Sequence, residues 1–265
     1  MEKKNVFWIV VVLVAILTGL GYQYSQHDVA NKMFANDLTA IAKGEVTGKT
    51  AVRKIGHNHA LATANETVYD QSDLMTRITM SQYLFIASTS ANDSTAGTGA
   101  TYMTVHGLDG DFAFQEEQIA IEGRDTVRTA NEYIRICCMV IDSVGSGGVT
   151  AGDITIKNTD CDTTLATISA GENRAYIGAF TVPATKTFYL THLYASTAKG
   201  ILTNVTLWVR PFEGAWYEIS GAQVWLASIE YPYPLPFVIA AKTDIELRAK
   251  GNTSEVIAGF AGWYE

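Results

Sequence analysis

DIELRAK, residues Asp244–Lys250, is the stretch that decides the fold class. Its apolar and charged side chains alternate strictly. The apolar ones are Ile245, Leu247 and Ala249, and the charged ones are Asp244, Glu246, Arg248 and Lys250. Successive side chains of a β-strand point to opposite faces, so we expect the apolar set to face a core and the charged set to face water. The pattern predicts a half-buried antiparallel strand.

Alternating or apolar runs separated by turn-forming residues continue through most of the chain after Thr67. Further strands are expected at Tyr83–Ala87, Thr101–Gly107, Phe112–Ile121, Tyr133–Ile141, Asp153–Lys157, Tyr176–Val182, Thr187–Ser196, Asn204–Arg210, Gln223–Ile229 and Val256–Tyr264. YPYPLPF, residues 231–237, is expected at a sheet edge or a crossing between sheets, because proline has no N–H to donate. No helical pattern interrupts these strands. The expected fold class is therefore all-β, an antiparallel and jelly-roll-like β-sandwich over residues 50–265.

Residues 1–24 are expected to form a hydrophobic anchor helix. The segment of about 17 residues from Val6 to Tyr22 carries no charge, close to the ~20 that span a bilayer core. Lys3 and Lys4 precede it, so the positive-inside rule predicts that residues 25–265 lie outside. Two alternatives stay open: a cleaved secretory signal and a helix buried inside a protein assembly. The anchor residues are Val6, Phe7, Trp8, Ile9, Val10, Val11, Val12, Leu13, Val14, Ile16 and Leu17.

Residues 25–49 are expected to form a short amphipathic helix and a linker. Asp28–Lys43 fits a helix with an N-cap aspartate and a glycine after its end. Phe34, Leu38 and Ile41 fall on one face of it. This narrow stripe needs a partner, which is either the β-domain or the same helix of neighbouring subunits. The second possibility predicts a homo-oligomer, with a trimer as the guessed symmetry.

Composition and motifs exclude several function classes. The net charge is −8 and the 19 basic residues are scattered singly, so no nucleic-acid partner is expected. No nucleophile elbow or dinucleotide fingerprint occurs, and GEVTGKT, residues 44–50, has one residue too few for a phosphate-binding loop. We therefore expect no enzyme and no cofactor. His57 and His59 could share one face of a strand, but no third ligand is near them in sequence, so no metal site is expected.

Six stretches, in one order over about 200 residues, carry a resemblance. They are GHNHALATANETVYD (Gly56–Asp70), STSANDSTAGTGATYMTVHGLDGDF (Ser88–Phe112), GDITI (Gly152–Ile156), YIGAFTVPATKTFYLTHLYAS (Tyr176–Ser196), LWVRPF (Leu207–Phe212) and PLPFVIAAKTDIELRA (Pro234–Ala249). Together they resemble little-characterised virion structural proteins of tailed bacteriophages, especially marine ones. The resemblance implies a β-sandwich that decorates or projects from a phage particle, and it transfers no catalytic residue.

The expected function is that of a non-enzymatic virion protein, a minor capsid, decoration, collar or spike component, attached by its N-terminal helix. Its expected location is the virion, and its expected partners are other virion proteins. The membrane-like N-terminus departs from the resemblance, so attachment to capsid, tail or lipid stays open, with possible membrane contact through residues 5–24. The alternatives are a membrane-anchored cell-surface or filament subunit of the pilin kind, with its β-domain outside, and a secreted carbohydrate-active enzyme or lectin.

Overall fold

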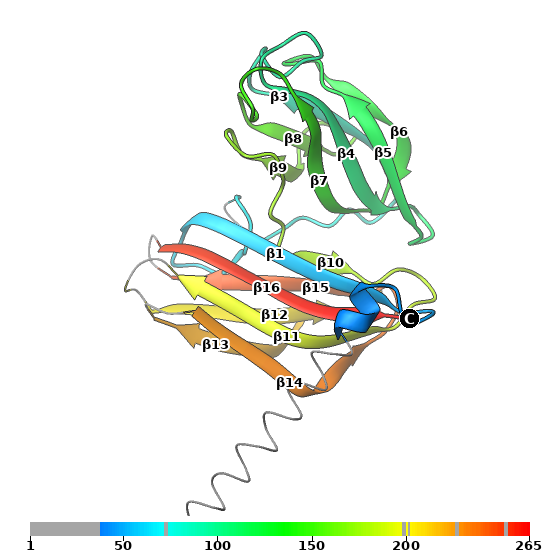
Figure 1. Ribbon diagram of the computed structural model, residues 1–265, viewed down its shortest axis with the longest axis vertical. Helices are drawn as coiled ribbons and strands as arrows, with labels where there is room; N and C mark the ends of the chain where they lie inside the picture. Colours follow the sequence, from blue (N-terminus) through cyan, green and yellow to red (C-terminus); the bar gives the residue numbers. More distant parts are fainter. Residues whose placement is uncertain (1–37, 72–73, 198–199, 201, 226–227, 252–253) are drawn as a thin grey trace, which may run out of the picture. The chain divides into compact units, whose positions relative to one another are not determined.

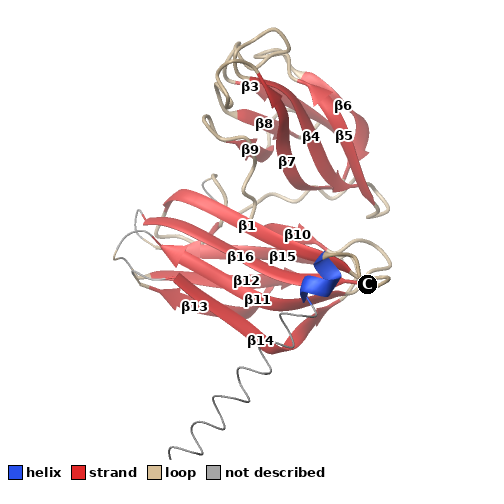
Figure 2. Ribbon diagram, viewed as in Figure 1, coloured by secondary structure: helices blue, strands red, loops and turns tan. Residues whose placement is uncertain are grey.

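The computed structural model describes residues 38–265 except 72–73, 198–199, 201, 226–227 and 252–253 (Figure 1). The described residues are all-β, with 57% strand and 2% helix, and their sheets are antiparallel, as predicted (Figure 2). Residues 52–265 form one compact unit. Its described residues contain two large hydrophobic cores, each between a pair of sheets, and a smaller cluster of Leu108, Phe112, Ile134 and Cys137. The sequence pattern predicted a single sandwich over residues 50–265.

Residues 38–42 are helical, and Gly44 follows them with a φ of 75°, the left-handed conformation expected of a glycine that ends a helix. Leu38 is half-buried and Ile41 is buried. The predicted anchor helix, residues 1–24, and Phe34 lie outside the described residues. Among the helices of the described part, none is long and apolar enough to cross a membrane.

The first pair of sheets, here called the terminal sandwich, is built from both ends of the described chain. One sheet has the order β1 (Thr50–Leu61), β16 (Ser254–Tyr264), β11 (Phe188–Thr197), β14 (Ser228–Ile239). The other has the order β10 (Ala179–Thr181), β15 (Asp244–Lys250), β12 (Thr203–Arg210), β13 (Tyr217–Val224), with β2 (Glu66–Thr67) also paired to β15. Fully buried side chains such as Phe188, Leu247 and Phe260 fill the space between them.

The second pair, here called the inserted sandwich, uses only strands that lie between β2 and β10 in sequence. One sheet has the order β6 (Val127–Tyr133), β3 (Gln82–Ser88), β8 (Ile154–Lys157), β9 (Thr164–Ile168). The other has the order β5 (Phe114–Ala120), β4 (Ala100–Leu108), β7 (Arg135–Val144). Met103 and Val105 are buried in its core, as their alternation on one face predicted.

The loop between β3 and β4 is organised by one buried carboxylate. Asp93 is 0% exposed and accepts hydrogen bonds from the Ser88 hydroxyl at 2.6 Å and from the backbone N–H of Ala100 at 2.8 Å. It also accepts from the backbone N–H of Ala151 at 2.8 Å and of Gly152 at 2.9 Å, in the loop before β8. Two turn-rich loops that are distant in sequence are therefore fixed to each other through a single side chain.

Most predicted strands are confirmed, and the errors have identifiable causes. YPYPLPF lies in β14, at the edge of its sheet, as its prolines require. The predicted strand Gln223–Ile229 is wrong, because β13 ends at Val224 and β14 begins at Ser228. β1, β2, β6, β9 and β13 were not predicted. In β1 apolar and polar residues do not alternate over the first positions, so the sequence lacks the period-2 pattern that indicates a strand.

The expected exposure of the charged face of DIELRAK is also wrong. Ile245, Leu247 and Ala249 are 0% exposed, as predicted. Asp244, Glu246 and Arg248 are 2%, 0% and 7% exposed, and of the four charged residues only Lys250 is exposed. Polar groups leave water at low cost only when other groups hydrogen-bond or pair with them. β15 is covered on both faces, and the buried charged side chains on its second face are hydrogen-bonded or ion-paired.

Candidate functional site

The buried charges of β15 form the centre of an ionic joint, defined here as Asp244, Glu246, Arg77, Arg135, Arg210 and Arg248. The two acids and Arg248 come from β15, and Arg210 from the end of β12. Arg77 comes from the segment after β2, and Arg135 from the start of β7. Strands of both sandwiches therefore contribute to one set of ion pairs.

Asp244 is held from three sides. Arg135 donates to it from Nε at 2.8 Å and from Nη2 at 3.0 Å, and Arg210 donates from Nη2 at 2.6 Å. The Thr181 hydroxyl donates at 2.6 Å. Burial alone would raise the pKa of Asp244, but the charges of Arg77 and Arg135 and the hydrogen bonds of Arg135 and Thr181 together lower it well below its ordinary value. The carboxylate therefore stays ionised at neutral pH.

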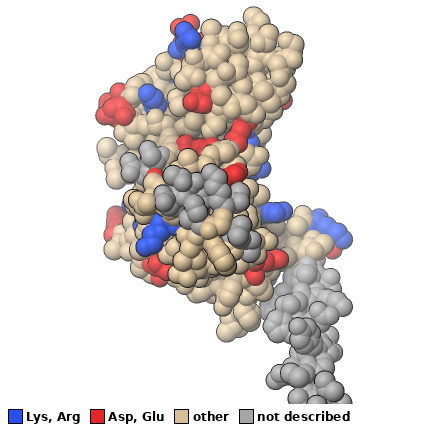
Figure 3. All heavy atoms as spheres, turned by 90° about the vertical axis from the view of Figure 1, so that its left-hand side faces the viewer, with Lys and Arg blue, Asp and Glu red and all other residues tan. Residues whose placement is uncertain are grey.

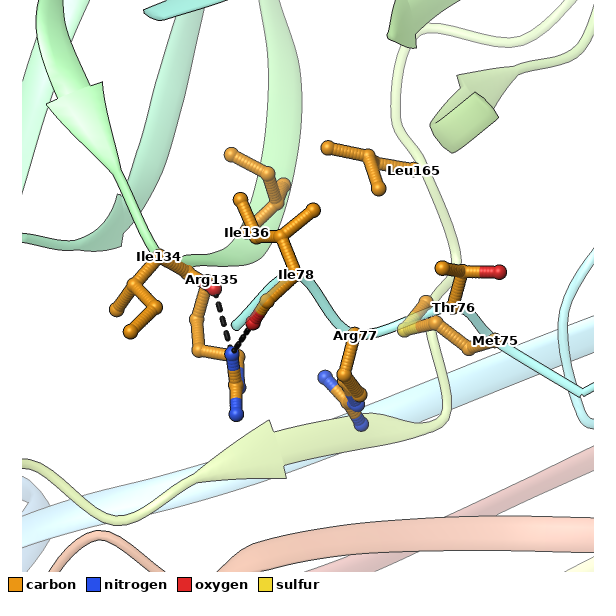
Figure 4. Close-up of a pocket in the computed structure, with 8 residues that line it drawn as sticks. All are labelled: Met75, Thr76, Arg77, Ile78, Ile134, Arg135, Ile136 and Leu165. Carbon is orange, nitrogen blue, oxygen red and sulfur yellow. Dashed lines mark hydrogen bonds between the residues drawn. The ribbon is translucent and has the colours of Figure 1, made fainter. Parts of the chain in front are cut away.

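Arg135 connects Asp244 to the backbone of the segment that follows β2. Its Nη1 donates to the carbonyl oxygens of Ile78 and Ile134, both at 2.7 Å (Figure 4). Desolvation lowers the pKa of Arg135, while Asp244 opposes that effect. A guanidinium presents a planar fork of donors, and here that fork bridges a carboxylate and two carbonyls. Arg135 is thus the residue that ties β7 to β15.

Glu246 forms the second centre of the joint. It accepts from the Thr67 hydroxyl at 2.6 Å and from Arg248 Nε at 3.2 Å. Its Oε2 lies 4.0 Å from Arg77 Nη2 and, like Arg77 Nε and Nη2, has no hydrogen-bond partner in the described structure. Arg77 therefore compensates the buried charge as an ion pair at longer range.

A pocket of ≈ 340 Å³ lies beside Asp244. Three of its lining residues, Phe112, Glu213 and Lys242, have positive φ values of 63°, 58° and 59°. Lys242 Nζ lies 5.2 Å from the ring centroid of Phe112 and 5.1 Å from that of Phe212. Neither histidine nor cysteine is among the described residues that line the pocket. The lining residues are Ile78, Thr79, Phe112, Ile134, Arg135, Arg210, Pro211, Phe212, Glu213, Gly214, Lys242 and Asp244.

A second group of titratable residues, the histidine cluster, is defined as His57, His59, Asp70, Glu172 and Glu255. His57 Nε2 lies 2.8 Å from Glu255 Oε1. His59 Nδ1 lies 2.8 Å and 2.7 Å from the two Asp70 oxygens, and its Nε2 lies 3.7 Å from Glu172 Oε1. The two imidazole ring centroids are 3.8 Å apart.

The sequence pattern singles out the two histidines but not the three acids. Asp70 follows β2, Glu172 lies between β9 and β10, and Glu255 is on β16. His57 and Glu255 are 198 positions apart, so no local spacing could reveal their contact. Only the pairing of β1 with β16 brings Glu255 to the histidines.

The acids of the histidine cluster alter the pKa of neighbouring groups. Burial works against protonation of His59, but the hydrogen bond to Asp70 and the charges of Asp70, Glu172 and Glu255 outweigh it and raise its pKa. Burial, together with the charge of Asp70, raises the pKa of Glu172. The cluster is thus a concentration of negative charge around two imidazoles.

The surface charge agrees with the scattered basic residues of the sequence. On the face shown in Figure 3, Lys and Arg side chains lie at separate places among uncharged residues and do not form one basic area. The cysteines Cys137, Cys138 and Cys161 are free thiols. Burial raises the pKa of the Cys137 thiol, which makes it less reactive.

Comparisons with known proteins give limited matches. No family model and no curated protein matches this chain. Among solved structures it is similar to infectious bursal disease virus, Gt strain, with a TM-score of 0.22 and 10% identity over 82% of this chain and 71% of that one. A mutant VP2 protein of the same virus in derived T=1 particles gives a TM-score of 0.23 and 10% identity over 82% and 68%. At these TM-scores the likeness to viral capsid proteins defines no common architecture.

Proposed function

We propose that this chain is a non-enzymatic structural protein of a bacteriophage virion, attached through its N-terminal hydrophobic segment and displaying the two sandwiches. Its partners are other virion proteins and further copies of itself, with a trimer as the proposed symmetry. The observation that supports the proposal is the position in the fold of the stretches that resemble phage virion proteins. These stretches contain residues that hold loops or strands to one another.

Four of the six stretches supply the ionic joint and its hydrogen bonds. Gly56–Asp70 contributes Thr67, and Tyr176–Ser196 contributes Thr181. Leu207–Phe212 contributes Arg210, and Pro234–Ala249 contributes the three charged residues of β15. These stretches supply the terminal-sandwich side of the ionic joint, whereas Arg77 and Arg135, which reach it from the segment after β2 and from β7, lie in none of them.

The other two stretches meet at the buried aspartate. Ser88–Phe112 contains Asp93. Gly152–Ile156 begins with Gly152, whose backbone N–H donates a hydrogen bond to Asp93 at 2.9 Å. All six stretches thus contain residues with a role in fixing loops or sheets. This distribution favours a scaffold or display protein over an enzyme, whose shared residues would gather around a reactive group.

Mass spectrometry of density-purified phage particles tests the proposal. We expect peptides of this chain at a fixed copy number per particle, in the fraction that carries infectivity. Recovery only from the host cell envelope would instead support the filament or cell-surface alternative and would overturn the virion assignment.

The attachment role of the N-terminal segment gives a second prediction. Val11→Asp with Leu13→Asp should prevent attachment, because each aspartate costs about 2.5–3.5 kcal/mol at the centre of a membrane-spanning helix and a comparable desolvation penalty inside a protein bundle. Incorporation of the double variant into particles, assayed by immunoblot, should be lost while the β-sandwiches keep their melting transition. Val149→Asp, a change at an exposed position, is the matched control. Normal incorporation of the double variant would exclude the segment as the attachment site.

A further inference from the structure

The geometry of the histidine cluster points to a binding site for one divalent transition-metal ion, with Zn²⁺ as the natural occupant. One ligand atom each from His57, His59 and Glu255 lie within 4.8 Å of one another. The same is true of His59, Asp70 and Glu172. The two groups share His59, so a single ion beside that imidazole can draw ligands from both. This inference does not depend on the proposed virion role.

The tautomer of His59 is set by its neighbours. Nδ1 donates to Asp70, whose oxygens also accept from the His59 backbone N–H at 3.1 Å and from the Ser169 hydroxyl at 2.9 Å. Asp70 is thereby fixed, and with a proton on Nδ1 the Nε2 lone pair of His59 is available to a metal. A carboxylate that orients a histidine in this way is the usual outer partner of a metal-bound imidazole.

Three other groups complete the set around Nε2 of His59. They are Glu172 Oε1 at 3.7 Å from that nitrogen, the imidazole of His57, and Glu255 Oε1 at 2.8 Å from His57 Nε2. Ligand atoms around a tetrahedral ion with bonds of about 2.1 Å are separated by roughly 3.4 Å, a value that lies between these two distances. Glu172 belongs to the other candidate group, so its side chain has to move toward His57 and Glu255 to bind the same ion. The metal takes the place of the proton between His57 and Glu255.

The donor set selects the class of ion. Two imidazole nitrogens favour zinc and neighbouring transition metals, while Mg²⁺ and Ca²⁺ prefer oxygen ligands only. The two carboxylates balance the charge of a divalent ion. With Glu172 brought in as a fourth protein ligand the tetrahedral shell is closed, as in structural sites and unlike catalytic sites that keep one position open. The ion would fasten β1 and β16 to the connection between β9 and β10.

Titration of tag-free, full-length protein in detergent with Co²⁺, after chelator treatment, tests the site. We expect one Co²⁺ per chain with the visible absorption bands of a tetrahedral ion, and loss of these bands when Zn²⁺ is added. His59→Ala should abolish them, and Asp70→Asn should weaken binding about 10- to 100-fold, because it disturbs only the orienting carboxylate. Zn²⁺ should also raise the melting temperature of the wild-type protein but not of His59→Ala.

His106→Ala is the matched control, because His106 pairs with Glu116 at 3.0 Å but belongs to neither candidate metal group. It should bind Co²⁺ like the wild-type protein. Absence of a tetrahedral spectrum in the wild-type protein would overturn the site. Equal binding by wild type, His59→Ala and Asp70→Asn would do the same. Asp70→Asn is nearly isosteric, so it remains informative if His59→Ala fails to fold.

Discussion

Asp244→Ala is expected to lower the free energy of unfolding by about 3–5 kcal/mol, the usual effect of removing one partner of a buried ion pair. The loss leaves the guanidinium of Arg135, whose side chain is 8% exposed, without its carboxylate. It also leaves Arg210 and the Thr181 hydroxyl without an acceptor. Urea unfolding followed by tryptophan fluorescence measures the change. Trp208 and Trp216 lie near the joint, each with its ring centroid 4.6 Å from Arg248.

Two further variants separate charge from position. Asp125→Ala, at an exposed aspartate, should change stability by no more than about 0.5 kcal/mol. Asp244→Asn keeps the shape of the side chain but removes its charge. The stability that this variant loses relative to wild type therefore measures the contribution of the charge. A loss at Asp244→Ala no larger than that of the exposed control would show that the joint does not hold the sandwiches together.

The contribution of Asp244 to the free energy of unfolding should depend on pH, with a sign that follows from its lowered pKa. The pKa of Asp244 is lowered in the folded protein, so its pairing stabilises the fold fully above the ordinary aspartate pKa of about 3.9. Below that pH the carboxylate of Asp244 is protonated in the unfolded chain but stays ionised in the folded chain. The stability difference between wild type and Asp244→Asn should therefore shrink as the pH falls below about 4. A difference that grows on acidification would contradict the assigned ionised state.

Asp93→Ala should lower the free energy of unfolding by about 4 kcal/mol or more, because each buried donor left unpaired costs about 1–3 kcal/mol. The backbone N–H groups of Ala100, Ala151 and Gly152 all lose their acceptor together, as does the Ser88 hydroxyl. Thermal unfolding by circular dichroism and urea unfolding both measure the effect. The loss should be confined to the inserted sandwich, which contains both loops.

Asp109→Ala is the matched control for that change. Asp109 also accepts two backbone N–H groups, those of Asp111 and Ala113, each at 2.9 Å, but in a water-accessible turn. Water can replace its oxygens, so the expected loss is only about 0.5–1.5 kcal/mol. Equal losses at Asp93 and Asp109 would mean that burial of the Asp93 loop adds nothing to stability.

The sequence predicted the strands well because most of them carry a local signal. β4 and β15 alternate, and the prolines of β14 restrict it to an edge. The direction of the charged face of β15 could not be predicted in the same way. Alternation shows that two faces differ, but it does not show that a second sandwich covers the polar one.

The histidine cluster shows the same limit of prediction from sequence, here for a site and not for a strand. His57 and His59 are visible as a pair, and strand geometry places them on one face. Glu255 and Glu172 reach them only through the β1–β16 pairing and the connection between the sandwiches. Such contacts depend on the order of strands in the sheets, which residue spacing does not encode.

The pairing of β1 with β16 has a consequence for how the protein is made. A ribosome releases β1, which begins at Thr50, long before β16, which begins at Ser254, so the first strand stays without its neighbour until β16 has been synthesised. The strands β3 to β9 pair only among themselves and emerge without interruption, so they can complete their sheets on the nascent chain. During that interval β1 presents unpaired backbone groups that another polypeptide could capture. We therefore expect translation rate and chaperone access to affect the yield of this protein more than that of a chain whose neighbouring strands follow one another.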